Sequence, residues 1–293
     1  MESGEFRILL KDENKDRTLL SSYRPIALLS VIGKVLEKVI VNRVNELYKN
    51  AGLESPDQFR FRKGEGTDDA FMSLRRAIRF TEKKYVLTIF VDIEGAFNNL
   101  WWPAILARLV SANCSTQILS MIKSYFKNRK IVVKNKMKEN TRIMEKGCPQ
   151  GSIIGPAAWV WCMDIVLNDL RKEIPPEFAD FIAYADDLAC VVKGNTRTEL
   201  NTNSERIIEI LSGWCNSHKL KISGTKTVAI MFKWNLDESR LTAIKIDGKC
   251  IKFVEKVKYL GMIIDKKTQL SGTCQIPTSE NHAARRYDKE NRS

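Results

Sequence analysis

Two adjacent acids, Asp186 and Asp187, interrupt an otherwise apolar stretch in the second half of the chain. The apolar runs on either side, residues 178–184 and 188–192, each have the length of a β-strand, so the pattern predicts a hairpin with acids at its tip. Acids are common turn residues, and an Asp-Asp pair in isolation is read as a plain turn. The surroundings of this pair decide between a turn and a functional site.

A third acid, Asp92, ends another apolar run of strand length, residues 85–91. If these strands are neighbours in one sheet, the three carboxylates converge at its edge, where their mutual repulsion calls for a cation. Hard oxygen ligands suit Mg²⁺ or Mn²⁺, with substrate phosphates completing the coordination shell. Two such ions about 4 Å apart can activate an attacking oxygen and stabilise a leaving one. The apolar flanks and the matching acid therefore favour a phosphoryl-transfer site over a plain turn.

Other periodic segments predict a mixed order of helices and strands. Helices are expected over about 30–49, from 67, from 103, and over 116–127, 156–172 and 198–218; strands are expected over 130–135, 141–145, 227–232, 243–253 and 256–264. Three-to-four spacing in the first helix predicts one buried face, made of Val31, Val35, Leu36, Val39, Ile40, Val44 and Leu47. This order favours an α+β sheet with helices on one face over a regular alternation of βα units.

The net charge of +13 indicates a polyanionic partner, either nucleic acid or an anionic membrane surface. Part of the surplus is concentrated in residues 123–146, where nine Lys or Arg stand against two Glu on a predicted hairpin. A solvated hairpin is the plainer interpretation of such a run. Its neighbours favour contact with a nucleic-acid backbone, for which the candidates are Lys127, Arg129, Lys130 and Lys134.

The remaining composition narrows the class of protein. The most apolar stretch, residues 153–163, is broken by Gly155-Pro156 and is too short to span a membrane. Glu2 and Glu5 stand where a signal peptide needs positive charge. Seven cysteines without Cys-x-x-Cys spacing argue against a zinc site and fit a reducing compartment. We therefore expect an intracellular protein, nuclear or cytoplasmic, that is neither secreted nor membrane-bound.

Seven blocks of this sequence resemble, in the same order, those of reverse transcriptase domains from non-LTR (LINE-type) retrotransposons. They are YRPIALLS (23–30), QFRFRKGEGTDDA (58–70), FVDIEGAF (90–97), GCPQGSIIGP (147–156), FIAYADDLA (181–189), LKISGTKT (220–227) and KYLGMIID (258–265). Any one block alone is weak, but seven in order are specific. The run AFNNLWWPAIL (96–106) further resembles the insect-type elements of this family.

The resemblance implies a right-hand polymerase fold in consecutive parts. These are a polar N-terminal arm (1–21), fingers (22–84), a palm with an antiparallel ferredoxin-like sheet and a primer-grip hairpin (85–265), and an irregular tail (266–293). The tail does not resemble the helical thumb that follows the palm in the family. The thumb is therefore expected to be largely missing.

The resemblance also implies roles for individual residues. Asp92 and Asp186 are expected to hold two Mg²⁺ or Mn²⁺ ions, with Asp187 as a supporting acid. Contact with the incoming nucleotide is expected from Arg62, Lys63, Phe97, Gln150, Gly151 and Lys226. The primer grip is expected at Tyr259, Leu260 and Gly261. Each has a plainer alternative from the residues alone: a core aromatic, an ordinary turn, or a solvated surface charge.

The implied activity is RNA-directed DNA polymerisation, with an RNA template, a DNA primer and deoxynucleoside triphosphates as partners. Arg60 departs from the family, which usually has Gly there, and Gly66 stands where Ser is usual. If position 60 needs a positive φ, Arg costs roughly 1 kcal/mol or more. The alternative function is a degenerate remnant that binds nucleic acid without catalysis. A cellular relative from splicing or telomere maintenance fits less well, because the blocks are LINE-like throughout.

Overall fold

The computed structural model describes residues 3–10, 12–13, 16–19, 22–62, 64–135, 138–148, 151–233 and 243–266. Its helices are α1 (Val31–Asn50), α2 (Thr67–Arg79), α3 (Ala96–Asn99), α4 (Trp102–Ser111), α5 (Thr116–Phe126), α6 (Ile154–Glu173) and α7 (Arg197–Ser217). Its strands are β1 (Ser3–Leu10), β2 (Tyr23–Leu28), β3 (Tyr85–Val91), β4 (Lys130–Asn135), β5 (Lys138–Ile143), β6 (Ala179–Tyr184), β7 (Asp187–Gly194), β8 (Val228–Lys233), β9 (Lys245–Ile246), β10 (Lys249–Cys250), β11 (Lys252–Phe253), β12 (Lys256–Tyr259) and β13 (Met262–Asp265). No helix within these ranges combines the length and apolarity needed to cross a membrane. The predicted tail lies, beyond Lys266, outside the described residues.

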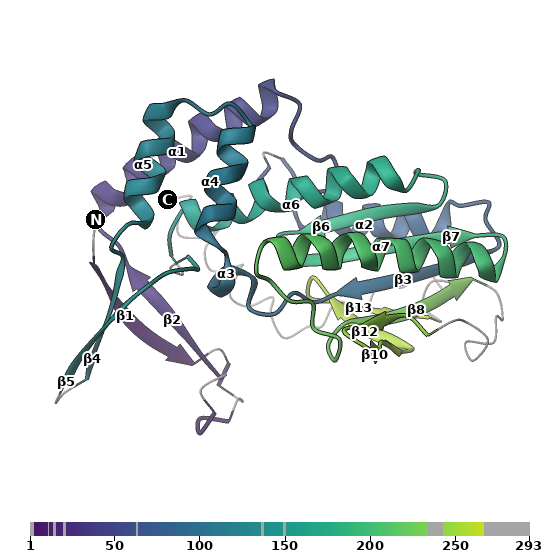
Figure 1. Ribbon diagram of the computed structural model, residues 1–293. Helices are drawn as coiled ribbons and strands as arrows, with labels where there is room; N and C mark the ends of the chain where they lie inside the picture. The colour runs from purple at the N-terminus through teal and green to yellow at the C-terminus, as the bar shows by residue number, and fades with distance from the viewer. Residues whose placement is uncertain are drawn as a thin grey trace, which may run out of the picture.

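A five-stranded sheet in the order β11-β8-β3-β7-β6 runs through the larger part of the molecule (Figure 1). Its pairs are antiparallel except at the short edge strand β11, which runs parallel to β8. Strands β3 and β7 are almost unbroken apolar sequence because both faces of the sheet are covered. The strand that ends at Asp92 and the hairpin around Asp186 are neighbours in this sheet, as predicted.

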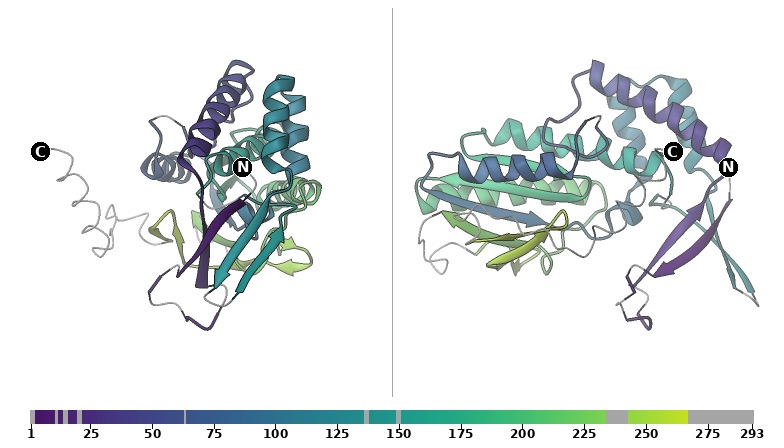
Figure 2. Two further views of the ribbon diagram at one scale, coloured as in Figure 1. Left: turned by 90° about the vertical axis from the view of Figure 1, so that its left-hand side faces the viewer. Right: turned by 180° about the vertical axis from the view of Figure 1, so that it is seen from behind.

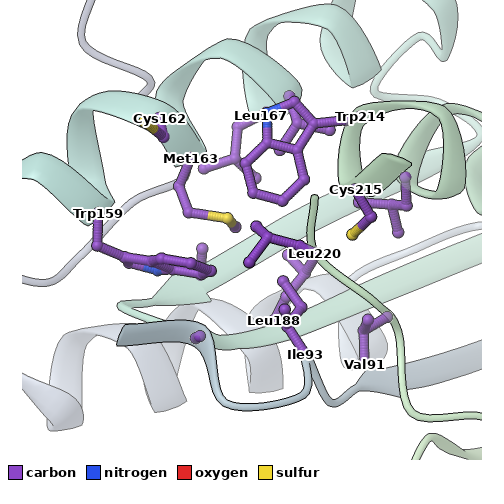
Figure 3. Packing of buried hydrophobic residues seen from close by; sticks show 14 of the residues in the cluster. Val91, Ile93, Trp159, Cys162, Met163, Leu167, Leu188, Trp214, Cys215 and Leu220 are labelled. Carbon is purple, nitrogen blue, oxygen red and sulfur yellow. The ribbon is translucent and has the colours of Figure 1, made fainter. Parts of the chain in front are cut away.

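Alternate residues along the strands face two different cores. The larger core lies under α6 and α7, and Figure 3 shows Trp159 and Met163 of α6 and Trp214 of α7 grouped near Leu188. The smaller core covers the opposite face, where α2 and the β12–β13 hairpin pack on Phe90, Ile182, Ala189, Val191 and Ile230. Helices therefore lie on both faces, not on one as expected. With both faces packed, the ends of the central strands have little freedom to move.

A second sheet, in the order β2-β1-β4-β5, lies at one end of the molecule beside α1, α4 and α5 (Figures 1 and 2). Strand β1 pairs antiparallel with β2 and parallel with β4, so Ser3 lies opposite Lys130. The predicted polar N-terminal arm therefore contains a strand over residues 3–10. Residues 5–10 pair with β2, whereas residues 3–5 pair with β4, a strand more than a hundred residues away that the local sequence does not indicate.

Helix α1 starts at the predicted cap, Ser30, but only part of its predicted buried face is buried. Ile40 and Val44 are buried, whereas the exposed residues include Val31, Val35, Leu36 and Val39. The helix instead buries Glu37, whose carboxylate accepts hydrogen bonds from the amides of Ile153 (2.6 Å) and Ile154 (3.3 Å). A carboxylate at the N-terminus of α6 is favourable there, and this contact sets the rotation of α1.

Two short hairpins follow β8. Strands β9 and β10 turn at Asp247-Gly248, as predicted. The single strand predicted over 256–264 is instead the hairpin β12–β13, because Leu260 (φ 50°) and Gly261 (φ 82°) reverse the chain in a two-residue turn.

Candidate active site

Three carboxylates lie at one end of strands β3, β6 and β7. Val91 of β3 pairs with Leu188 of β7. Asp92 follows Val91 and Asp187 precedes Leu188, so both leave the sheet at the same end. Asp186 occupies the turn between β6 and β7. The convergence of the three acids predicted from sequence is therefore present.

The surroundings of Asp186 and Asp187 raise the pKa of both carboxyl groups. Although Asp187 keeps contact with solvent, desolvation raises its pKa to about 6, and the charges of Asp186 and Asp92 add to the rise. Burial also raises the pKa of Asp186; the charge of Asp92 adds to that effect and the charge of Arg60 opposes it. Like charges held together in partly desolvated surroundings gain from a cation nearby.

The donor set fits a divalent ion. Asp92 Oδ1 is buried and accepts no hydrogen bond, and Mg²⁺ and Mn²⁺ bind carboxylate oxygens of this kind. Across the described ranges, no three His, Cys, Asp or Glu side chains are already gathered into a metal-holding group. Asp92 and Asp186 are the residues that would hold ions here, leaving the other coordination positions to phosphate oxygens and water.

A lysine-containing loop lies against Asp92. The Lys226 ammonium is 3.6 Å from Asp92 Oδ1, in a largely exposed pair that adds little stability. The backbone of Asp92 is held on both sides: its amide donates to Thr227 Oγ1 (3.2 Å), and its carbonyl accepts from the Ser223 amide (2.8 Å). The structure thus brings the predicted residue Lys226 to the carboxylates.

The β12–β13 hairpin closes a cavity of about 110 Å³ next to the acids, lined in part by Asp92, Asp187, Lys226 and Tyr259. Only 5% of Tyr259 is exposed. Its hydroxyl donates to the Ile182 carbonyl (3.1 Å), and its ring packs on the core. Tyr259 therefore anchors the hairpin, and its role in the primer grip stays a prediction. Leu260 and Gly261 form the turn itself.

Two more predicted nucleotide contacts flank α6. The Phe97 ring is partly buried, with its centroid 5.7 Å from that of Trp159, and its carbonyl accepts from the Cys148 amide (2.9 Å). Gly151 has φ 102°, and a Cβ there would lie 2.9 Å from the Ala27 carbonyl oxygen, so only glycine fits this approach. Gln150 lies outside the described residues.

The predicted triphosphate-binding residue Arg62 is not directed at the carboxylates. Its guanidinium donates to the Ser55 carbonyl and lies 4.0 Å from Asp164 Oδ1. Both residues line a cavity of about 520 Å³ between α1, the segment before α2 and the first half of α6. Burial raises the pKa of Asp164 to about 7, and the charge of Arg62 opposes that rise. Lys63 lies outside the described residues.

The basic segment contains both exposed and buried cations. Lys127 and Lys130 are exposed, as a backbone-contacting surface requires. Arg129 is only 5% exposed, with its guanidinium 4.1 Å from the centroid of the Tyr125 ring and donating to the Tyr125 carbonyl (3.3 Å). The prediction that Arg129 contacts nucleic acid is therefore wrong, because the aromatic ring and the carbonyl already satisfy it. Lys134 lies in β4, but its side chain is outside the described residues.

Sequence reasoning gave no role to Glu37 and none to Gln58. Glu37 is fully buried and links α1 to the loop that leads into α6. A lone acid on an apolar helix face is a signal that could have indicated such a contact. Gln58 is also fully buried, against the catalytic turn. It stands inside one of the seven blocks, but its type and spacing alone do not reveal its partner.

An antiparallel sheet that carries its carboxylates at the tip of the β6–β7 hairpin, with helices packed on both faces, is typical of the right-hand polymerase class of fold. The chain belongs to the reverse transcriptase (RNA-dependent DNA polymerase) family, whose model matches residues 11–264. Telomerase from Candida tropicalis, in its apo form truncated from the C-terminal domain, has the same fold, with a TM-score of 0.62 at 13% identity. That similarity covers 91% of this chain and 54% of the telomerase chain. The predicted fold class is confirmed.

Among known proteins, this chain is similar to those of insect retrotransposable elements. It is 34% identical over 258 residues to a 115 kDa protein in type-1 element R1DM of Drosophila melanogaster, covering 88% of this chain and 24% of that protein. It is also 34% identical over 260 residues to the Pol polyprotein of the R1 element of Bradysia coprophila, covering 89% of this chain and 25% of that protein. The chain thus spans about a quarter of the length of these relatives. The predicted non-LTR retrotransposon relationship is confirmed.

Proposed function

We propose that this chain is the polymerising part of a reverse transcriptase, which extends a DNA primer with deoxynucleotides on an RNA template. The observation that carries the proposal is the convergence of Asp92, Asp186 and Asp187 at the end of a sheet packed on both faces. In the relatives named above, the same domain belongs to longer proteins. We place the reaction inside the cell, in the nucleus or the cytoplasm.

In the proposed reaction, the primer 3′-oxygen attacks the α-phosphorus of a deoxynucleoside triphosphate and pyrophosphate leaves. Asp92 and Asp186 would hold the two divalent ions, and Asp187 would keep the local field negative. When bound, Mg²⁺ or Mn²⁺ supplies Lewis acidity and lowers the pKa of the attacking hydroxyl. Lys226, already paired with Asp92, is placed to neutralise charge on the leaving pyrophosphate.

Residues around α6 shape the nucleotide site in this proposal. The partly buried Phe97 ring excludes a ribose 2′-hydroxyl by bulk, and the backbone at Gly151 approaches the templating base. Arg62 reaches the triphosphate only by leaving Asp164, so nucleotide binding would exchange one ion pair for another. Lys127 and Lys130 give the adjoining surface its attraction for the nucleic-acid backbone.

A primer-extension assay with an RNA template, Mg²⁺ or Mn²⁺ and deoxynucleotides tests the proposal. Asp186→Asn should lower extension by at least about a hundredfold, because it removes a charge that the transferring phosphates need. The matched control is Asp169→Asn, which changes an exposed acid on α6 and should leave extension unchanged. Equal activity of the wild type and Asp186→Asn would contradict the proposal.

The second candidate, a remnant that binds nucleic acid without catalysis, rested on Arg60 and on the thumb that the sequence predicts to be largely missing. In the structure Arg60 does not have a positive φ, whereas the next residue, Phe61, does (65°). The anticipated backbone penalty at position 60 is therefore absent. RNA–DNA duplex binding by the wild type without extension under either metal would revive this candidate.

A further inference from the structure

The segment before α2 lies along the catalytic hairpin, not apart from it. The Ala183 amide donates to the Asp57 carbonyl (2.8 Å), and the Phe59 amide donates to the Ala183 carbonyl (2.9 Å). Gln58 thereby forms a parallel bridge with Ala183. The segment extends the five-stranded sheet at its β6 edge, next to the turn that carries Asp186.

A partly buried ion pair fixes this segment to α6. Arg171 donates to both carboxylate oxygens of Asp57, at 2.7 and 2.6 Å. The same guanidinium donates to the Ala179 carbonyl at the start of β6 (3.2 Å). Two-pronged bonding of this kind holds both partners in one geometry, so the segment and the hairpin share a common support.

Ala185 in the catalytic turn has φ 60°, in the left-handed region that a residue with a Cβ rarely adopts. The Gln58 side chain bonds both backbone groups of this residue. Its Oε1 accepts from the Ala185 amide (3.0 Å), and its Nε2 donates to the Ala185 carbonyl (3.5 Å). Gln58 has no exposed surface, so no water competes for these bonds. A strained residue persists where its surroundings over-determine it.

Arg60 holds the other side of the same turn. Its guanidinium donates to the Tyr184 hydroxyl (2.6 Å) and lies 4.9 Å from the centroid of the Tyr184 ring. The Arg60 amide in turn donates to Gln58 Oε1 (3.0 Å). Two successive turn residues, Tyr184 and Ala185, are thus each held by a side chain from one short segment.

We propose that Gln58 and Arg60 are positioning residues that hold the turn 184–187 in the geometry in which Asp186 binds metal. The proposal rests on the proposed function, since it assigns a use to the same carboxylates. Without Gln58, the left-handed Ala185 loses both bonds that hold it, and the turn relaxes towards ordinary backbone angles. Asp186, the next residue, then moves away from Asp92.

The principal test compares Gln58→Leu with Gln117→Leu, which makes the same change on the exposed face of α5. Mn²⁺ binding to the full chain, followed by electron paramagnetic resonance, measures the site directly, with Asp186→Asn marking the signal that belongs to it. Gln58→Leu should weaken that binding by about tenfold to a hundredfold, as loss of a ligand-orienting partner does. Gln117→Leu should bind as the wild type does. Unchanged Mn²⁺ affinity in a folded Gln58→Leu variant overturns the proposal.

A rescue variant separates positioning from general packing. Ala185→Gly removes the Cβ that makes a positive φ unfavourable, so the turn no longer depends on Gln58 to hold that conformation. The double variant Gln58→Leu/Ala185→Gly should therefore recover much of the lost Mn²⁺ affinity, by about threefold or more. No recovery would mean that Gln58 acts only by filling space, and this too overturns the proposal.

The Arg60 contact is tested by a double-mutant cycle on primer extension. Arg60→Ala and Tyr184→Phe each break the guanidinium–hydroxyl bond, and each should lower kcat by about threefold to tenfold with little change in the nucleotide KM. The kcat of the double variant should be no lower than that of the less active single variant, because both changes remove the same interaction. Arg43→Ala, an exposed change on α1, is the control. If the two changes lower kcat additively, Arg60 and Tyr184 act independently, and this contradicts the positioning role of Arg60.

The two measurements keep the proposals distinguishable. Suppose that the wild-type chain binds Mn²⁺ but extends no primer, and that Gln58→Leu weakens Mn²⁺ binding. This result supports the positioning role of Gln58 and contradicts the proposed polymerase activity. Normal extension and Mn²⁺ binding in Gln58→Leu contradict positioning alone.

Discussion

The two sheets of this protein are built on different principles. The strands β3, β6 and β7 are apolar and packed on both faces, and they bring acids together only where they end. The sheet β2-β1-β4-β5 consists of two hairpins joined by the pairing of β1 with β4, and it leaves apolar residues such as Ile143 exposed. One sheet gains its order from a core, and the other gains it from backbone hydrogen bonds. We therefore expect catalysis and stability to depend on the first sheet, and the strength of nucleic-acid binding on the basic segment that leads into the second.

The largest expected difference between the two sheets is the effect of a substitution on primer extension. Asp92→Asn at the end of β3 should lower primer extension by at least about a hundredfold, since it removes one of the two carboxylates that we propose hold metal. Lys130→Gln at the start of β4 should keep at least about half the activity at low salt, because one phosphate contact contributes little there. Comparable losses in the two variants would break the comparison.

The same contrast should appear in stability. Ile89 in β3 is fully buried, and Ile89→Ala should lower the free energy of unfolding in urea by about 3 kcal/mol, through lost contacts and the cavity left behind. Ile143 in β5 is 64% exposed, and Ile143→Ala should change that free energy by less than about 0.5 kcal/mol. A similar cost at both positions would mean that the second sheet has a packed core of its own.

The burial of Asp164 should make the stability of the protein depend on pH. Burial raises the folded-state pKa of Asp164 from 3.8 to about 7, so the folded protein binds this proton more tightly than the unfolded chain. The resulting stabilisation is fully present below about pH 4 and is lost as the pH rises to about 7. Asp164→Asn removes this dependence and should make the variant more stable than the wild type by roughly 2–4 kcal/mol at about pH 8.

Thermal unfolding of the wild type and Asp164→Asn across this pH range measures the difference. The extra stability of Asp164→Asn over the wild type should decrease steadily as the pH falls towards about 4. A variant that is less stable than the wild type at about pH 8 would show that the Arg62 pair outweighs the burial of Asp164.

The smallest expected effect concerns the basic segment. The double change Lys127→Gln/Lys130→Gln should weaken RNA–DNA duplex binding evenly across sequences and reduce the slope of log affinity against log salt by about 1 to 2. Lys172→Gln, an exposed lysine on α6, is the control. Arg129→Gln should leave the salt slope unchanged, because that side chain is buried on Tyr125.

Much of the central sheet could be predicted from the sequence. The apolar runs before Asp92 and around Asp186 indicated neighbouring strands, because a continuous apolar run of strand length is typical of a strand buried on both faces. The N-terminal strand β1 could not be predicted, since its own residues are not periodic and one of its two partners, β4, is remote. The rotation of α1 was missed for a related reason: the buried Glu37 is satisfied only by amides at the start of α6.

The family, the three acids and the order of the elements around them could be inferred from the amino-acid sequence, because they follow from local pattern and from seven ordered blocks. The partner of each other candidate residue became visible in the folded protein alone. The tertiary structure placed Lys226 on Asp92, turned Arg62 towards Asp164, buried Arg129, and set Gln58 and Arg60 against the catalytic turn. The reason is physical: a side chain's role depends on the partner that it meets across the fold, and residue type and spacing do not specify that partner.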